Sequence, residues 1–378
     1  MENRKKYLGE IKRIVVKIGS SSLTSQEGGL DIDNMKKFAG EVSIVAREGI
    51  EVIIVTSGAI AAGLKYLNIS QKPEDITILQ SAASVGQVEL MRTYSNLFYK
   101  NQLKIGQILL THEDTTRRQQ YLNIKNTIEN LIKLNVIPII NENDSVATEE
   151  IKFGDNDRLA ALVSTLIEAD ILIILSDIDG MYDKNPGTNS DARLISQVNN
   201  ISEDIEEIAG GIGSTYGSGG MVTKIKAARV CSFSGIGMII ANSRQPDVLG
   251  KIINNENVGT FFVPQNIKKV RSVKKWIAFG ARTRGSIVID RGAEEAIVSR
   301  GKSILPVGVL EVSGKFNKGD TIKVFSVDSK LIAKGISSFS NEDIVKVKGK
   351  NEKQILTEFD SSMCREIIHR DSLVVFSS

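Results

Sequence analysis

Histidine and cysteine are scarce in this sequence, which contains two of each among 378 residues. Cys231 and Cys364 lie far apart and fit no spacing pattern, so the sequence predicts neither a disulfide framework nor a zinc site. Such cysteine usage is typical of a reducing compartment, and we expect a cytoplasmic location. The histidines, His112 and His369, both lie outside the polar loops described below, which therefore lack an imidazole base.

Long apolar runs and a strong net charge are missing as well. The longest runs, such as ILIIL at residues 171–175, are far too short to span a membrane. The basic N-terminal stretch lacks the apolar segment and cleavage site of a signal peptide. The net charge of +3 is too small to favour a nucleic-acid or membrane partner. The P-loop, the dinucleotide fingerprint and the protein-kinase signatures are also absent, so a bound nucleotide needs another loop arrangement.

Residues 1–264 repeat a rhythm of apolar strand, polar loop and helix. An apolar run at 14–18 opens the rhythm, and similar runs occur in EVIIVTSG, KIGQILL, NVIPII, ILIILSD and GIGMIIAN. Runs of this kind are typical of parallel strands that helices cover on both faces. The sequence therefore predicts an α/β fold, a three-layer αβα sandwich with a mostly parallel central sheet. Its first long helix is predicted to begin with Asp33 as the cap.

The pattern changes after Pro264. Residues 265–279 contain the stretch KKVRSVKKW, which has no acidic residue, and predict a basic linker. Residues 280–378 consist of short β-like pieces separated by glycine turns, such as GSIVIDRGA and KGDTIKVFSV. They predict a second, small β-rich domain.

Polar residues follow the predicted strands of the first domain. Ligands gather beyond the carboxyl ends of strands in such sheets, so we expect these residues to form one site. The residues are Lys17, Gly19, Ser57, Gly58, Asn141, Asp144, Ser176 and Asp177.

Two features of this predicted site suit a phosphate group. Lys17 leads directly into a Gly-Ser turn, whose backbone N–H groups can approach an oxyanion closely. The glycine-rich stretch GIGSTYGSGGMVTKIKAA precedes a predicted helix with Lys224 in its first turn and with Val222, Ile225 and Ala228 on one face. Two roles stay open for Asp157 and for the carboxylate after Ser176: holding Mg²⁺, directly or through water, and fixing the lysines. No residue is assigned as a direct metal ligand.

The stretch NENDSVATEEIKFGDND, residues 141–157, is rich in carboxylates and asparagines and connects a predicted strand to a predicted helix. Asp155, Asn156 and Asp157 lie at the start of that helix. We expect these acids and amides to bind a ligand with an ammonium group, and the helix start with Asn156 to bind its carboxylate. A carboxylate acceptor is already ionised and needs no general base, which fits the scarcity of histidine.

Five segments carry a family resemblance. VVKIGSSSL, VTSGAIAAG, INENDSVATEEIKFGDND, LSDIDGMY and GSGGMVTKIKAA, in this order, resemble the amino-acid kinase family, in particular its members that phosphorylate glutamate. RGSIVIDRGAEEAIVSRGKSILPVGV resembles the PUA module that many of these members carry, so the resemblance extends over essentially the whole chain. It implies an amino-acid kinase fold followed by a PUA domain. The implied activity is ATP-dependent phosphorylation, with Mg²⁺, of the γ-carboxylate of L-glutamate to L-glutamyl 5-phosphate, the first step of proline biosynthesis.

The resemblance also implies residue roles. Lys17 and Lys224 would neutralise the transferring phosphoryl group, and Asp157 would orient both lysines. Glutamate would be bound by Ser57, Asp144 and Asn156, with Asn141 and Asp155 as helpers. Ser176 stands where the family more often has threonine, which keeps a hydroxyl. The implied ATP-binding residues are Lys17, Gly19, Ser176, Asp177, Ser218, Gly219, Gly220, Met221, Val222, Thr223 and Lys224.

Several alternatives and partners accompany this hypothesis. Other members of the family use aspartate, acetylglutamate, carbamate or uridylate as the acceptor. The PUA-like domain also raises an RNA-binding role, but its basic and acidic side chains nearly balance, which is a weak footprint for RNA. The resemblance further implies inhibition by proline and a homo-oligomer, commonly a dimer or tetramer.

Overall fold

The computed structural model of the protein describes residues 4, 6–7, 10–25, 27–147, 156–211, 220–265, 270–363 and 365–376. The chain divides into two units, of which the first comprises Met1–Thr115 and Gln119–Lys269. The second comprises Thr116–Arg118 and Val270–Ser378. Of the predicted site residues, Asp155, Ser218 and Gly219 lie outside the described residues.

An eight-stranded sheet forms the centre of the first unit, in the order β3-β4-β2-β1-β5-β7-β8-β6. The pairs from β3 through to β7 are parallel, and β8 runs antiparallel to β7. The strand that carries Lys17, β1, lies in the middle with a parallel neighbour on each side. The strands are β1 (Arg13–Ile18), β2 (Glu51–Val55), β3 (Lys104–Leu110), β4 (Val136–Glu142), β5 (Ile171–Ser176), β6 (Gln197–Val198), β7 (Gly237–Asn242) and β8 (Thr260–Phe262).

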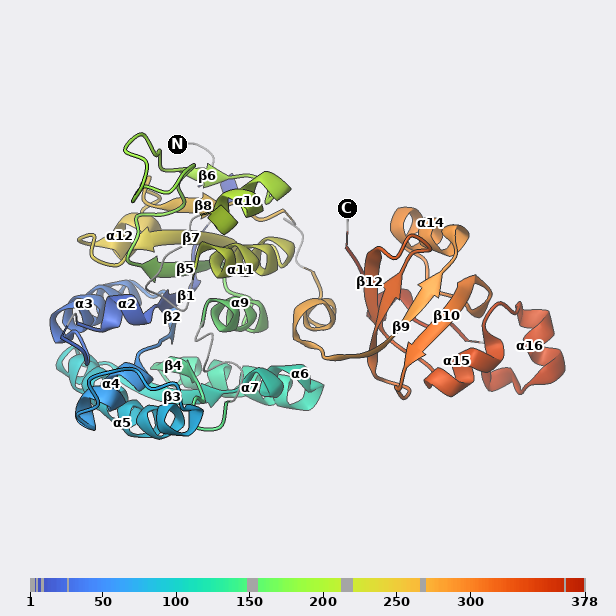
Figure 1. The fold of residues 1–378 in the computed structure, drawn as a ribbon, viewed down its shortest axis with the longest axis horizontal. Coiled ribbons are helices and arrows are strands. Elements are labelled where there is room, and N and C mark those ends of the chain that lie inside the picture. Colours follow the sequence, from blue (N-terminus) through green and yellow to red (C-terminus); the bar gives the residue numbers. More distant parts are fainter. Residues whose placement is uncertain are drawn as a thin grey trace. The chain divides into compact units, whose positions relative to one another are not determined.

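Helices cover both faces of this sheet (Figure 1). The helices α3, α5 and α12 lie on one side, and α7, α9 and α11 lie on the other. The result is the predicted three-layer αβα sandwich. The helices of this unit are α2 (Ser20–Leu23), α3 (Ile32–Arg47), α4 (Ala59–Tyr66), α5 (Ile76–Lys100), α6 (His112–Thr116), α7 (Arg118–Lys133), α9 (Asn156–Leu166), α10 (Glu203–Gly211), α11 (Met221–Phe233) and α12 (Val248–Ile253).

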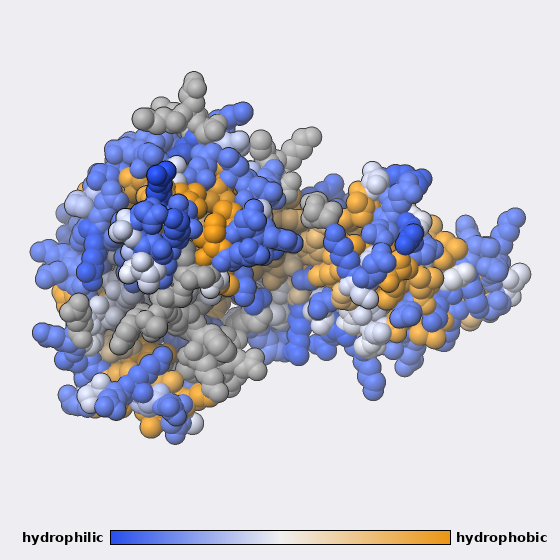
Figure 2. Space-filling view, turned by 45° about the horizontal axis from the view of Figure 1, so that its top comes forward, coloured by the Kyte–Doolittle hydropathy of each residue, from blue (hydrophilic) through white to orange (hydrophobic). Residues whose placement is uncertain are grey.

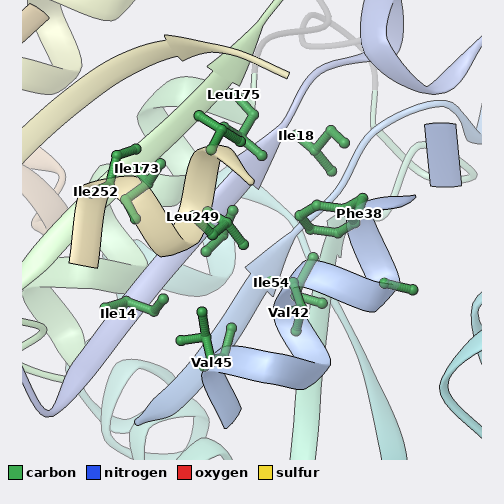
Figure 3. Close-up of a cluster of buried hydrophobic side chains, with 14 of the residues drawn as sticks. Ile14, Ile18, Phe38, Val42, Val45, Ile54, Ile173, Leu175, Leu249 and Ile252 are labelled. Carbon is green, nitrogen blue, oxygen red and sulfur yellow. The ribbon is translucent and has the colours of Figure 1, made fainter. Parts of the chain in front are cut away.

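Branched apolar side chains join the sheet to α3 and α12 (Figure 3). Phe38 and Val42 of α3 pack with Ile54 of β2, and Leu249 of α12 belongs to the same buried cluster. Each β1 residue from Ile14 to Ile18 is buried, which explains why that strand reads as an unbroken apolar run apart from its lysine. A rigid core therefore holds the carboxyl end of β1 in place.

The start of α3 differs from the predicted one. The side chain of Asp31 accepts a hydrogen bond from the Asn34 N–H at 3.0 Å, so Asp31 caps the helix. Asp33, the predicted cap, lies in the first helical turn and is exposed. Both aspartates suit a helix start, but only Asp31 has the extended backbone that capping requires.

Two glycines let α4 and α5 approach each other closely. A Cβ on Gly63 would lie 1.8 Å from the carbonyl oxygen of Ala82, and a Cβ on Gly86 would lie 1.8 Å from that of Ala59. Because neither position tolerates a side chain, the crossing of these helices is fixed at backbone contact. This crossing determines where the neighbouring residue of α5, Gln87, lies.

The second unit is built on a five-stranded sheet, in the order β10-β9-β11-β12-β13. The sequence predicts a basic linker at residues 265–279. Part of it forms the short helix α13 (Ser272–Lys275), and a π-helical turn, Trp276–Gly280, follows directly. Lys334 of β12 donates to the carbonyl oxygen of Ala278 at 2.9 Å, which ties this turn to the sheet. The strands are β9 (Thr283–Ile289), β10 (Val309–Gly314), β11 (Thr321–Phe325), β12 (Leu331–Ile336) and β13 (Leu373–Val375), and the helices are α14 (Arg291–Arg300), α15 (Asn341–Val347) and α16 (Glu352–Glu358).

The separate β-rich unit confirms the second half of the predicted fold class. Hydrophilic side chains cover much of the visible face of both units, with hydrophobic residues in patches between them (Figure 2). Among the described residues, no helix has both the length and the apolar character needed to cross a membrane.

Candidate active site

Lys17 occupies a buried position at the carboxyl end of the central strand. Its backbone lies between Val55 of β2 and Ile174 of β5, and its side chain is only 5% exposed. Gly19 follows at the strand end, where a Cβ would come within 3.4 Å of the Lys17 ammonium nitrogen. The glycine therefore leaves room around the ammonium group that a larger residue would restrict.

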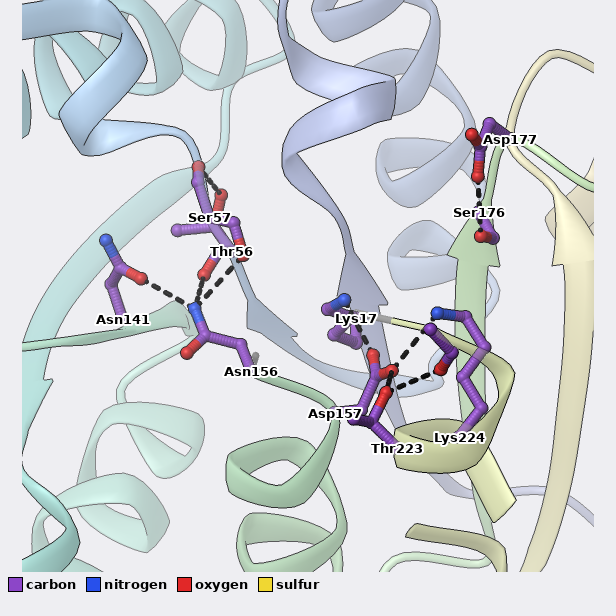
Figure 4. A network of polar contacts seen from close by, with 11 residues as sticks. Lys17, Thr56, Ser57, Asn141, Asn156, Asp157, Ser176, Asp177, Thr223 and Lys224 are labelled. Atoms are coloured by element: carbon purple, nitrogen blue, oxygen red, sulfur yellow. Dashed lines mark hydrogen bonds and ion pairs between the residues drawn. The ribbon is translucent and has the colours of Figure 1, made fainter. Parts of the chain in front are cut away.

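Three charged side chains, those of Lys17, Asp157 and Lys224, meet in one place (Figure 4). Together with the hydroxyl of Thr223 they form what we call the ionic cluster. Lys17 Nζ lies 2.6 Å from Asp157 Oδ1, and Lys224 Nζ lies 3.2 Å from Asp157 Oδ2. Thr223 Oγ1 donates to Asp157 Oδ2 at 3.1 Å. Two elements, β1 and α11, thus bring ammonium groups to the single carboxylate that α9 supplies.

The charges in this cluster do not balance. Asp157 is 0% exposed and Lys224 is 4% exposed, so water does little to screen them. Burial raises the pKa of Asp157, but the ammonium groups of Lys17 and Lys224 outweigh that effect and hold the pKa well below its usual range. With Asp157 ionised, two cations face one anion. Two buried ammonium groups side by side are favourable for an incoming anion such as a phosphoryl group.

A second group of side chains, the amide cluster, lies next to the first. It consists of Asn156, Asn141 and Gln87. Asn156 Nδ2 donates to the backbone carbonyl of Thr56, to Ser57 Oγ at 3.1 Å and to Asn141 Oδ1 at 2.9 Å. Asn141 Nδ2 in turn donates to Gln87 Oε1 at 2.8 Å. Since Asn156 and Asp157 are consecutive at the start of α9, one helix end serves both clusters.

The loop after β2 is held by a hydrogen bond to a buried tyrosine and by the backbone conformation of a glycine. Thr56 Oγ1 lies 2.9 Å from the hydroxyl of Tyr94, a fully buried residue whose pKa burial raises far above its usual value despite that hydrogen bond. Gly58 has φ +98°, a left-handed conformation that favours glycine, and it begins α4. Ser57 is thereby held at the mouth of the sheet between two constrained residues.

A pocket of about 170 Å³ opens beside the amide cluster. Asp144 and Glu142 contribute carboxylates to its wall, and Ser57, Asn141 and Asn156 contribute polar groups. The apolar part of the wall comes from α4. Four of the five residues predicted to bind glutamate therefore line one pocket, and the fifth, Asp155, lies outside the described residues.

The residues predicted for the nucleotide lie at neighbouring positions of the same sheet edge. Ser176 ends β5 and donates to Asp177 Oδ1 at 3.0 Å. Gly220 precedes α11, and Met221 is buried, whereas Val222 is 41% exposed. The predicted apolar face of Val222, Ile225 and Ala228 is thus wrong for Val222, because the buried face of α11 begins at Met221 and includes Lys224.

The described residues do not offer a protein cage for a metal ion. Among them, no group of three or more histidine, cysteine, aspartate or glutamate side chains lies close enough to hold one. Both carboxylate oxygens of Asp157 lie against ammonium groups, one of Lys17 and one of Lys224. Asp177 is exposed and contacts Ser176.

Two contributors to the site were missed from the sequence. Thr56 supplies the backbone carbonyl that receives Asn156, and Gln87 supplies the acceptor for Asn141. Gln87 lies within α5 and not in a polar loop. The only sequence signal for Gln87 is a lone amide in the largely apolar stretch SAASVGQVEL.

Comparison with known proteins decides the family. A model of the amino acid kinase family matches residues 12–242, and a PUA domain model matches residues 285–359. The chain belongs to the amino acid kinase family. The predicted resemblance is confirmed for both halves of the chain. Membership of this kinase family implies ATP as the phosphoryl donor.

Relatives that match nearly the full length include the following two. The protein named glutamate 5-kinase from Syntrophotalea carbinolica is 43% identical over 98% of this chain and 99% of its own length. The protein of the same name from Carboxydothermus hydrogenoformans is 46% identical over the same shares. Among solved structures, UMP kinase from Ureaplasma parvum covers 67% of this chain and 99% of its own, with 14% identity and a TM-score of 0.47.

Proposed function

We propose that this protein is a glutamate 5-kinase, which transfers the γ-phosphoryl group of ATP to the γ-carboxylate of L-glutamate. The product, L-glutamyl 5-phosphate, would enter proline biosynthesis. One observation carries the proposal: a buried cluster of two lysines and one aspartate adjoins a pocket lined by acids and amides, and the consecutive residues Asn156 and Asp157 link the two. The names of the full-length relatives support the same activity.

The pocket suits a free amino acid. Asp144 and Glu142 supply negative charge for the α-ammonium group of glutamate, which needs anionic partners when it leaves water. Ser57 and the amides supply further polar contacts. A ligand held in this way directs its γ-carboxylate toward Asp157 and the two lysines.

The transfer needs no general base. A γ-carboxylate has a pKa of about 4.3 and is ionised at neutral pH, so its oxygen attacks the γ-phosphorus directly. The new O–P bond forms while the bond from phosphorus to the β–γ bridging oxygen breaks, and ADP leaves with that electron pair. Lys17 and Lys224 offset the negative charge that donor and acceptor bring together, and Asp157 keeps the two ammonium groups in register.

The nucleotide is proposed to lie along Ser176, Asp177 and the start of α11, together with Ser218 and Gly219 from the sequence motif. Mg²⁺ would enter with the triphosphate and shield its charge, held by phosphate oxygens and water as this ion commonly is. The proposal includes three further properties that the family resemblance supports: inhibition by proline, a homo-oligomeric state and a cytoplasmic location.

An acceptor screen tests the proposal. ADP release is measured with glutamate, aspartate, acetylglutamate, carbamate and UMP, each with and without proline. Glutamate is expected to give the highest kcat/KM, and hydroxylamine is expected to trap its product as a hydroxamate, which identifies an acyl phosphate. Faster turnover of another acceptor, or a product that hydroxylamine does not trap, would overturn the assignment.

A further inference from the structure

Gln87 connects the glutamate pocket to a helix crossing outside it. It follows Gly86, whose backbone contact with Ala59 fixes α5 against α4. Its Oε1 accepts the hydrogen bond from Asn141 Nδ2 at 2.8 Å, and Asn141 is only 1% exposed. A buried amide N–H is thus satisfied by a side chain that the α4–α5 crossing holds in place.

One backbone carbonyl fixes the orientation of all three amides, of which Figure 4 shows Asn156 and Asn141. The Thr56 carbonyl can only accept, so Asn156 must present its nitrogen there. That nitrogen also donates to Asn141, which must therefore present oxygen and turn its own nitrogen toward Gln87. Gln87 must then present oxygen. The direction of each hydrogen bond follows from the one before it.

This chain of bonds determines what Asn156 can offer a ligand. Its two N–H bonds are shared among three acceptors, Thr56 O, Ser57 Oγ and Asn141 Oδ1, so its nitrogen has no hydrogen left for a substrate. Only its oxygen remains, and an oxygen accepts from an ammonium group. Asn156 is therefore suited to the α-ammonium of glutamate and not to its carboxylate, in contrast to the role expected from the sequence.

We propose that Gln87 is a positioning residue for glutamate binding, which acts through Asn141 to hold Asn156 with its oxygen toward the substrate. The inference rests on the proposed function and names a residue outside the family motifs. Gln87 does not line the glutamate pocket itself. Its contribution is the acceptor that keeps the buried Asn141 amide from rotating.

The first test removes the acceptor and keeps the shape. Gln87→Met has an unbranched side chain of similar length, and Gln87→Ala removes the acceptor without crowding the helix crossing. Both leave the Asn141 N–H without its partner, which weakens the orientation of Asn156. We expect the glutamate KM to rise about tenfold in both variants, while kcat and the ATP KM change less than about twofold.

Gln107→Met is the matched control. Gln107 and Gln87 line the same surface pocket, but Gln107 lies on β3 and is exposed. It undergoes the same chemical change, and its side chain is not among the hydrogen-bond partners that the structure describes for Asn141, Gln87 and Asn156, so its kinetics should match those of the wild type. Gln87→Glu retains an acceptor oxygen and should recover most of the glutamate affinity that Gln87→Met loses.

A double-mutant cycle tests the route through Asn141. If Gln87 acts only through Asn141, the variant with both Gln87→Met and Asn141→Ala should have the same glutamate KM as Asn141→Ala alone. If the increases in the glutamate KM from the two single substitutions multiply in the double variant, Gln87 does not act through Asn141. Thermal unfolding of each variant checks that it is folded. A positioning role then predicts that the glutamate KM rises without an equal rise in the ATP KM.

The outcomes distinguish this inference from the proposed function. If the wild type phosphorylates glutamate and Gln87→Met behaves like Gln107→Met, the inference fails and the function stands. Equal rises of both KM values also overturn it, because they indicate general damage. If the wild type does not phosphorylate glutamate, the proposed function fails and the inference fails with it.

Discussion

The ionic cluster and the amide cluster include consecutive residues of α9, Asp157 and Asn156, but different kinds of interaction hold the two clusters together. In the ionic cluster, Lys17 and Lys224 face one carboxylate, and the interaction depends chiefly on charge and burial. In the amide cluster, each group is neutral and the interaction depends on which atom faces which. Charge attracts from several directions, whereas an amide must present the correct end.

This difference suits the two halves of the proposed reaction. A phosphoryl group in transfer spreads its charge over several oxygens and moves between donor and acceptor, so non-directional cations stabilise it throughout. An amino acid must be held still and in one orientation, which directional hydrogen bonds achieve. It follows that substitutions in the ionic cluster should affect turnover most, and substitutions around the amide cluster should affect glutamate binding most.

The largest expected effect comes from Lys224→Ala. The substitution removes a cation that is 4% exposed and lies 3.2 Å from Asp157. Since the lost stabilisation belongs to the transition state, we expect kcat to fall about 10³-fold with modest changes in both KM values. Steady-state kinetics with glutamate and ATP varied in turn measure this split.

Lys226→Ala provides the control for Lys224→Ala. Lys226 lies two residues further along α11 and is exposed, so it shares the helix and the charge but not the cluster. Its turnover should stay within about twofold of the wild type. Near-normal kcat in Lys224→Ala would remove that lysine from the catalytic group and break the contrast between the clusters.

The second effect concerns stability and its pH dependence. Asp157→Asn removes the carboxylate that two buried ammonium groups share, which should cost about 3 kcal/mol of unfolding free energy at pH 7. Because the folded pKa of Asp157 lies below its ordinary value of 3.8, the stabilisation is fully present above that value. It is lost only as the pH falls below 3.8 toward the folded pKa. Denaturant unfolding of the wild type and the variant between pH 7 and pH 3 measures the difference.

Asp33→Asn is the matched control for this titration. Asp33 and Asp157 both lie in the first turn of a helix, so both interact with a helix dipole, but Asp33 is exposed. Its substitution should change stability by less than about 1 kcal/mol. If Asp157→Asn changed stability no more than Asp33→Asn, the lysines would contribute little to holding the cluster.

The sequence was sufficient for the ionic cluster because strand topology alone brings its members together. Lys17 lies near the end of the central strand β1, and Asp157 and Lys224 lie in the first turns of α9 and α11, which lead into β5 and β7 on one side of β1, so the order of elements brings the three residues to the same sheet edge. The predicted αβα layers followed from the same apolar runs. Periodicity and element order carry this kind of information.

Gln87 could not be predicted in the same way. Its place depends on a helix crossing set by Gly63 and Gly86, and neither glycine reveals from the sequence which backbone it will contact. The choice of Asp31 over Asp33 as a cap is a similar case, because both residues have the right chemistry and only local backbone geometry separates them. Details that depend on close approach or on a single dihedral angle need the structure.

The third effect, smaller than those of Lys224→Ala and Asp157→Asn, tests the binding half of the comparison. Asp144 lines the pocket beside the amide cluster and is proposed to accept from the α-ammonium of glutamate. Asp144→Ala should raise the glutamate KM about 30-fold, since a hydrogen bond to a charged group contributes about 2 kcal/mol, and should leave the ATP KM nearly unchanged. Ser145→Ala, at the exposed neighbouring position, controls for disturbance of the turn and should behave like the wild type. Parallel increases in both KM values would mean that the pocket and the ionic cluster do not divide the substrates between them, and the comparison would then lose its functional meaning.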